Sequence, residues 1–138
     1  MATQTAAARR EDARAAYDAF VKECPTTQLL ARISDKWVGL ILSALGEAEN
    51  GSMRYSEIGR KIPGVSQKML TQTLRSLERD GIVTRSVTAS VPVRVDYRLT
   101  ELGGSLGCLL SSVKRWAENH FDEVSAHRTA YDEAASAT

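Results

Sequence analysis

The sequence predicts a mainly α-helical fold of the α+β class, with a β-hairpin inserted between two helices. Three observations lead to this prediction. Residues 66–79 carry apolar side chains at helical spacing, residues 82–99 hold two β-rich runs around a turn, and residues 101–126 carry a long apolar stripe. A short helical segment and a tight turn precede residue 66. Helix, turn, helix and hairpin in this order are typical of a winged helix-turn-helix domain.

The charge distribution points to a polyanionic partner for the middle of the chain. The 138 residues carry a formal net charge of +1. Between Arg54 and Arg98, however, there are nine lysines and arginines and four aspartates and glutamates. A basic segment between more acidic ends fits an interaction with nucleic acid that is confined to that segment.

Three features favour a cytoplasmic protein. No run approaches the roughly eighteen apolar residues of a membrane span, so no membrane partner is expected. The first residues lack the hydrophobic core of a secretion signal. The two cysteines, Cys24 and Cys108, lie far apart in the chain, which does not suggest a disulfide framework.

The pattern divides the chain into a domain and two tails. Residues 1–8 are expected to form a disordered tail, and residues 127–138 a second tail. Residues 9–126 are expected to form a single winged-helix domain. Within it, residues 9–22 form an N-terminal arm helix and residues 101–126 a C-terminal dimerisation helix.

Two helices follow the arm. The Cys24-Pro25 step ends the arm and starts a short helix at about residues 27–33. A core helix is expected at about residues 36–45, before a polar loop at residues 46–52. The apolar positions of this core helix are Trp37, Leu40, Ile41, Ala44 and Leu45.

Residues 66–79 form the second helix of the helix-turn-helix. Ser56 is expected to cap the first helix, residues 57–62, and Ser66 to cap the second, which Gly81 ends. Its buried stripe is predicted to be Met69, Leu70, Thr73, Leu74 and Leu77.

The opposite side of this helix presents cations and amide or hydroxyl groups without a carboxylate. Its residues are Lys68, Thr71, Gln72, Arg75 and Arg79. Such a face suits the major groove of DNA, because the cations neutralise phosphates and the polar side chains can hydrogen-bond to base edges. The alternative is an ordinary solvated helix face.

The β-rich runs form the wing. Residues 93–99 alternate fully, with valine, tyrosine and leucine on one side and Arg94, Asp96 and Arg98 on the other. Pro92 lies at the hairpin tip because it cannot donate to a strand ladder. Arg94, near this tip, can reach a phosphate or a minor groove.

The last helix is expected to be capped by Thr100. Its long apolar stripe indicates contact with a second subunit. Its stripe comprises Leu102, Leu106, Leu109, Leu110, Val113, Trp116, Ala117, Phe121 and Val124. This length exceeds what a small winged domain can cover, which favours a homodimer; the alternative is burial by the arm helix of the same chain. Small residues on the other side, from Gly104 to Ser112, leave room for a neighbouring helix or a small ligand.

Several short motifs in order resemble those of the HxlR-type winged-helix transcriptional regulators, relatives of the MarR-like group. The resemblance covers about residues 24–116. The motifs are Cys24-Pro25, Asp35-Lys36-Trp37, residues 63–71 (PGVSQKMLT), residues 74–83 (LRSLERDGIV), residues 92–100 (PVRVDYRLT) and Leu102-Gly103. Departures are Gly39, Gly59 and Gly104, none of them on the proposed DNA face.

The resemblance implies a homodimer on a palindromic operator of double-stranded DNA, with the second helix in the major groove and the Arg94 wing beside it. The predicted DNA-binding residues are Lys36, Ser66, Gln67, Lys68, Thr71, Gln72, Arg75, Arg79 and Arg94. Ser66, Gln67, Thr71 and Gln72 would contact bases or backbone, and Lys68, Arg75 and Arg94 would mainly neutralise phosphates.

The same resemblance marks Cys24 as a redox-sensing residue, because several family members sense electrophiles, quinones or oxidants through a cysteine at this Cys-Pro position. A thiol just before a helix also feels the positive end of the helix dipole, which favours the reactive thiolate. The alternative is a small buried hydrophobe. Cys108 is expected to be structural; the alternative is a disulfide between Cys24 and the Cys108 of a second subunit.

The predicted function is therefore a regulator that represses transcription by occluding its operator. One alternative is a ligand-responsive regulator with a small-molecule pocket near the C-terminal helix, and another is a winged-helix module that binds protein. No metal, cofactor or enzymatic activity is expected: His120 and His127 are distant from both cysteines, and no phosphate-loop or nucleophile motif is present.

Overall fold

The computed structural model describes residues 3–137 and divides at Val38 into two compact units. The first unit contains α1 (Ala6–Glu23) and α2 (Pro25–Ile33). Thr5 caps α1 by accepting a hydrogen bond from the Ala8 N–H at 3.1 Å. Cys24 ends α1 and is the N-cap of α2, with Pro25 in the first helical position, where its missing N–H costs nothing.

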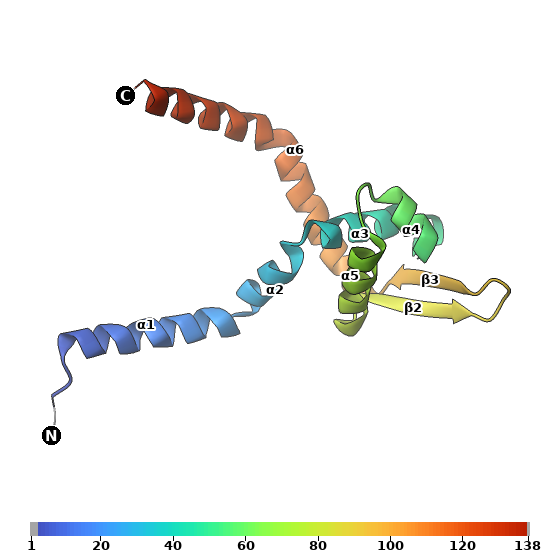
Figure 1. The fold of residues 1–138 in the computed structure, drawn as a ribbon, viewed down its shortest axis with the longest axis horizontal. Helices are drawn as coiled ribbons and strands as arrows, with labels where there is room; N and C mark the ends of the chain where they lie inside the picture. The colour runs from blue at the N-terminus through green and yellow to red at the C-terminus, as the bar shows by residue number, and fades with distance from the viewer. Residues whose placement is uncertain (1–2, 138) are drawn as a thin grey trace. The chain divides into compact units, whose positions relative to one another are not determined.

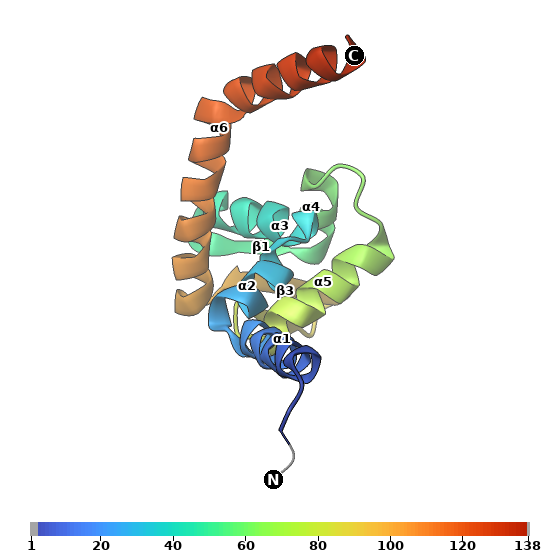
Figure 2. The same ribbon diagram turned by 90° about the vertical axis from the view of Figure 1, so that its left-hand side faces the viewer.

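Helix α3 (Lys36–Glu47) begins in the first unit and continues into the second. The second unit then adds a 3-10 turn (Glu49–Gly51), β1 (Ser52–Arg54), α4 (Tyr55–Lys61) and α5 (Gln67–Arg79). It ends with β2 (Val83–Thr88), β3 (Arg94–Leu99) and α6 (Glu101–Ser136). Figure 1 shows the β2–β3 hairpin extending beside α5, and Figure 2 shows the loop that links α4 to α5.

A three-stranded antiparallel sheet in the order β1-β3-β2 organises the second unit. Helix α5 contacts β2, α4 contacts β1 and β3, and α6 contacts β3. The fully buried side chains of this core are Ile41, Leu42, Leu45, Ile58, Leu70, Leu74 and Val83. The helices thus cover one hydrophobic core from several sides, which confirms the predicted mainly α, α+β winged helix-turn-helix fold.

Helix α6 starts against the backbone of the segment before β2. The Thr100 hydroxyl accepts from the Gly103 N–H at 3.0 Å, which confirms the predicted cap, and the Thr100 N–H donates to the Ile82 carbonyl at 3.0 Å. A Cβ atom added at Gly103 would lie 2.0 Å from the Ile82 carbonyl oxygen. Glycine is therefore required here by the close approach of two backbones.

Both long terminal helices exceed their predicted limits. Helix α1 begins at Ala6, so residues 6–8 are helical and not part of a tail; α6 continues to Ser136, so residues 127–136 are helical as well. The first extension consists of three alanines and the second contains three more among residues 127–136, and alanine has the highest helix propensity. Residues 1, 2 and 138 of the predicted tails lie outside the described residues.

Three smaller predictions are corrected. Residues 46–52, predicted as a polar loop, comprise the end of α3, the 3-10 turn and the first residue of β1, a strand too short to show a period. Helix α4 begins at Tyr55 with Arg54 as N-cap, so Ser56 lies inside the helix and does not cap it. In α3, Leu40 is 43% exposed whereas Leu42 is 2% exposed, because the buried stripe is rotated from the predicted one.

Candidate nucleic-acid interface

Helix α5 is anchored at both ends as its sequence predicts. The Ser66 hydroxyl accepts from the Met69 N–H at 3.1 Å, which satisfies one of the unpaired donors at the helix start. Asp80 is the C-cap, and Gly81 follows with φ of +74°, the left-handed conformation that glycine adopts without strain.

The buried side of α5 fixes its orientation. Leu70, Thr73, Leu74 and Leu77 are buried, and Met69 is half-buried. The Thr73 hydroxyl is satisfied inside the helix because it donates to the Met69 carbonyl at 2.8 Å. This burial turns Lys68, Gln72 and Arg75 outward, where all three are exposed.

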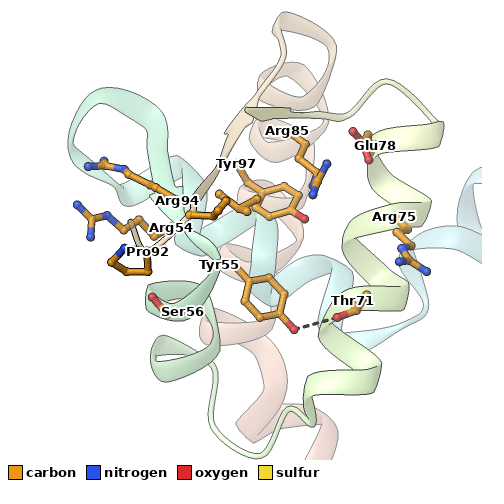
Figure 3. Close-up of a pocket in the computed structure, with 12 residues that line it drawn as sticks. Arg54, Tyr55, Ser56, Thr71, Arg75, Glu78, Arg85, Pro92, Arg94 and Tyr97 are labelled. Carbon is orange, nitrogen blue, oxygen red and sulfur yellow. Dashed lines mark hydrogen bonds between the residues drawn. The ribbon is translucent and has the colours of Figure 1, made fainter. Parts of the chain in front are cut away.

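Tyr55 joins α4 to the exposed side of α5. Its hydroxyl lies 2.9 Å from the Thr71 hydroxyl and donates to the Gln67 carbonyl at 3.2 Å. Figure 3 shows the Tyr55 ring reaching across to Thr71. Because Tyr55 bonds both to the backbone of the first turn and to a side chain one turn later, it ties the start of α5 to α4.

A groove of about 600 Å³ lies between α5 and the wing. It is lined from α5 by Thr71, Arg75 and Glu78, and from the β2–β3 hairpin by Arg85, Arg94 and Tyr97, among others. Arg54, Tyr55 and Ser56 line it from the start of α4. Four arginines therefore surround this groove (Figure 3). Among the described residues that line it, Glu78 alone carries a carboxylate.

Two of the four arginines have carboxylate partners. Arg94 Nε lies 2.9 Å from Asp96 Oδ2, and Arg54 Nε lies 3.8 Å from Glu57 Oε1. All but the Asp96 side chain are about half exposed, so solvent screens these pairs. The Arg94 pair still offsets part of the charge that the wing residue offers to a ligand.

The predicted site residues separate into three groups. Thr71, Arg75 and Arg94 line the groove; Ser66, Gln67, Lys68, Gln72 and Arg79 are exposed along α5 or at its N-cap. Lys36 lies in the first unit, with its Nζ 4.4 Å from the centre of the Trp37 ring, a cation–π contact.

The sequence interpretation missed Tyr55, Arg54 and Arg85. Arg85 was detectable, because residues two apart in a strand share a face of the sheet, and the buried Val83 lies two residues before Arg85. Arg54 and Tyr55 had no comparable signal, since β1 is only three residues long and α4 seven.

Cys24 lies half-buried between α1 and α2. The backbone N–H groups of Thr27 and Thr26 at the start of α2 lower the pKa of its thiol, their hydroxyls add to this, and burial opposes it. These N–H groups belong to the first turn of α2, where the positive end of the helix dipole also favours the thiolate.

The small residues of α6, possible metal ligands and possible membrane spans are the other features to consider. Gly104 and Gly107 face open space, with nothing within 4 Å of an added Cβ atom, so their side of α6 has room for another helix or a ligand. In residues 3–137, no three histidine, cysteine or acidic side chains gather as metal ligands. None of the described helices is both long and apolar enough to cross a bilayer.

An exposed, capped helix behind a tight turn, followed by a hairpin that bounds a basic groove, defines a winged helix-turn-helix protein. The HxlR-like helix-turn-helix family matches residues 32–125. The uncharacterized HTH-type transcriptional regulator YtfH of Escherichia coli K12 is 40% identical over 109 residues, which cover 79% of this chain and 84% of YtfH.

Solved structures agree with this assignment. The ytfH protein of Salmonella typhimurium is 37% identical with a TM-score of 0.70, over 80% of this chain and 96% of that one. The reduced form of the redox regulator HypR is 37% identical with a TM-score of 0.67, over 75% of this chain and 99% of HypR. The chain belongs to the HxlR-like helix-turn-helix family and is a transcriptional regulator, which confirms the family resemblance. The family and these relatives are regulators, not enzymes.

Proposed function

We propose that the chain is a homodimeric, cytoplasmic repressor that binds a palindromic operator in double-stranded DNA. The observation that carries this proposal is the outward face of α5, where Lys68, Gln72 and Arg75 are exposed while the opposite side is buried. A helix about 10–12 Å wide fits the major groove, which is about 12 Å across.

The roles along α5 follow from side-chain chemistry. Gln67 and Gln72 carry amides that can pair with adenine, and Ser66 and Thr71 can contact bases or backbone. Lys68, Arg75 and Arg79 neutralise phosphates. Arg94 contacts a phosphate or the minor groove from the wing, and Lys36 contacts a further phosphate. Glu78 borders the face on the groove side, so bases are contacted toward the N-terminal half of α5.

A mobility-shift assay on the DNA upstream of its own gene tests this function. We expect a shift that survives excess unrelated duplex, and a flatter salt dependence for Lys68→Ala, because one fewer phosphate is neutralised. Equal affinity for every sequence, or no shift at all, would contradict sequence-specific binding.

We further propose that Cys24 switches this activity. Its lowered pKa increases the thiolate fraction near neutral pH, and HypR, a structural relative, is described as a redox regulator. On reaction with a quinone, the thiolate sulfur bonds to a ring carbon, and the displaced electron pair takes up a proton. A change in operator affinity in the parent and not in Cys24→Ser supports this; equal responses would favour a small-molecule signal elsewhere, such as near Gly104.

A further inference from the structure

Among the residues that the structure describes, two arginines of the groove lack a carboxylate partner. Arg94 and Arg54 have Asp96 and Glu57 at 2.9 and 3.8 Å. Within residues 3–137, neither Arg75 nor Arg85 has an ion-pair partner within 4.0 Å. Their guanidinium groups are therefore available to an external anion.

These two arginines belong to opposite walls of the groove. Arg75 comes from α5, and Arg85 from β2, where it is paired with Tyr97 of β3. Figure 3 shows the Arg85 side chain extending from the hairpin toward α5, on which Arg75 and Glu78 lie. Arg54 and Arg94 lie on the side of the groove away from α5 in the same view.

The chemistry of this arrangement favours a phosphate. A guanidinium offers a planar set of N–H donors that matches two phosphate oxygens at once. Four arginines against Glu78 leave the groove cationic, and two of them have no carboxylate partner whose pairing an anion must displace. A cationic ligand would be repelled by these four arginines.

The position of the groove indicates that this phosphate belongs to the backbone of duplex DNA. If α5 occupies the major groove, the backbone strand that borders it runs along the flank of the helix. The wing bounds this flank, so the strand enters the space between α5 and β2. We propose that Arg85 and Arg75 hold a backbone phosphate of duplex DNA between them, with Arg54 and Arg94 at neighbouring phosphates. This inference rests on the proposed DNA-binding function.

Salt dependence of operator affinity gives the first test. For Arg85→Ala, we expect affinity to fall about tenfold, as for a lost charge-assisted contact, and the salt slope to fall by about 0.9. Arg85→Lys should keep the slope and lose part of the affinity, because it keeps the charge without the bidentate geometry. Arg115→Ala, an exposed cation on α6, should keep both values, and melting curves show whether each variant folds.

Neutralising single phosphates gives the decisive test. An operator in which one phosphate is replaced by an uncharged methylphosphonate should lose affinity for the parent protein at one position in each half-site. Arg85→Ala, which keeps Arg75, should lose clearly less affinity at that same position. If no position couples to Arg85 while the parent still binds its operator specifically, the clamp is wrong and the DNA-binding function stands. If the parent binds no duplex, both fail. Added free phosphate, at fixed ionic strength, could inhibit operator binding by the parent and not by Arg85→Ala, with the operator affinity and salt slope of the variant unchanged. The groove would then be a site for a small anion, and the clamp is again wrong.

Discussion

Two adjacent glycines at the start of α6 have opposite surroundings. An alanine Cβ at Gly103 would meet the Ile82 carbonyl oxygen at 2.0 Å, whereas one at Gly104 would meet nothing within 4 Å. The Thr100 cap and the Thr100–Ile82 hydrogen bond hold the two backbones together, so neither can easily move apart.

We predict that Gly103→Ala destabilises the fold by about 1–3 kcal/mol or more, because the new methyl forces α6 away from Ile82. Gly104→Ala is the matched control and should stabilise it by up to about 1 kcal/mol, since alanine restricts the unfolded chain and favours helix. Chemical denaturation measures both. Equal changes in the two variants would show that the backbones are not in contact.

Cys24 gives a second prediction at the residue scale. The Thr27 and Thr26 N–H groups lower the pKa of its thiol in the folded chain, and unfolding removes them. In a Cys108→Ser background, the rate of alkylation by iodoacetamide should therefore reach half its plateau at a lower pH in the folded protein than in urea. Peptide mass spectrometry follows the reaction, and coincident pH midpoints would remove the electrostatic basis for sensing.

At the scale of elements, Tyr55 sets how α5 is presented. Its hydroxyl bonds to Thr71 and to the Gln67 carbonyl, both in the N-terminal half of the helix. A hydroxyl in this position limits rotation and sliding of α5 against α4, which matters most where base contacts are proposed.

We predict that Tyr55→Phe costs about 1 kcal/mol of stability and lowers operator affinity, because the ring remains but α5 loses its tie to α4. Thr71→Val removes the other hydroxyl. In a double-mutant cycle, the two changes should couple by more than about 0.5 kcal/mol in operator binding. Additive effects would mean that Tyr55 contributes only through its ring.

The same scale explains what the sequence could and could not predict. Helix α5 and the hairpin were recognisable because their periods are long and their ends carry Ser66, Gly81 and Thr100, whose side chains or conformations fix local geometry. The short β1 has no period of its own and exists because β3 offers it a partner edge. The groove needed the fold, since it combines Arg54, Arg75 and Arg85 from three separate segments.

At the scale of the whole molecule, α6 carries much more apolar surface than one chain covers. Leu109, Val113, Trp116 and Phe121 are each at least 50% exposed, along a single side of the helix. Helix α1 adds Tyr17 and Phe20, at 67% and 69% exposure. The exposed stripe of α6 is by itself a contiguous apolar surface of the kind that marks an interface, and a second copy of the chain is the proposed partner.

Val113 lies near the middle of this stripe, so Val113→Asp should place a charge in the proposed dimer interface and convert the protein to a monomer. Sedimentation velocity measures the mass, and operator affinity should fall by an order of magnitude or more, because two half-sites about 34 Å apart no longer bind as one unit. Asn119→Asp adds the same charge on the other side of α6 and should remain a dimer. A dimeric Val113→Asp protein with parental affinity would show that the stripe serves another purpose. Monomeric Val113→Asp with unchanged operator affinity would instead separate dimerisation from DNA recognition.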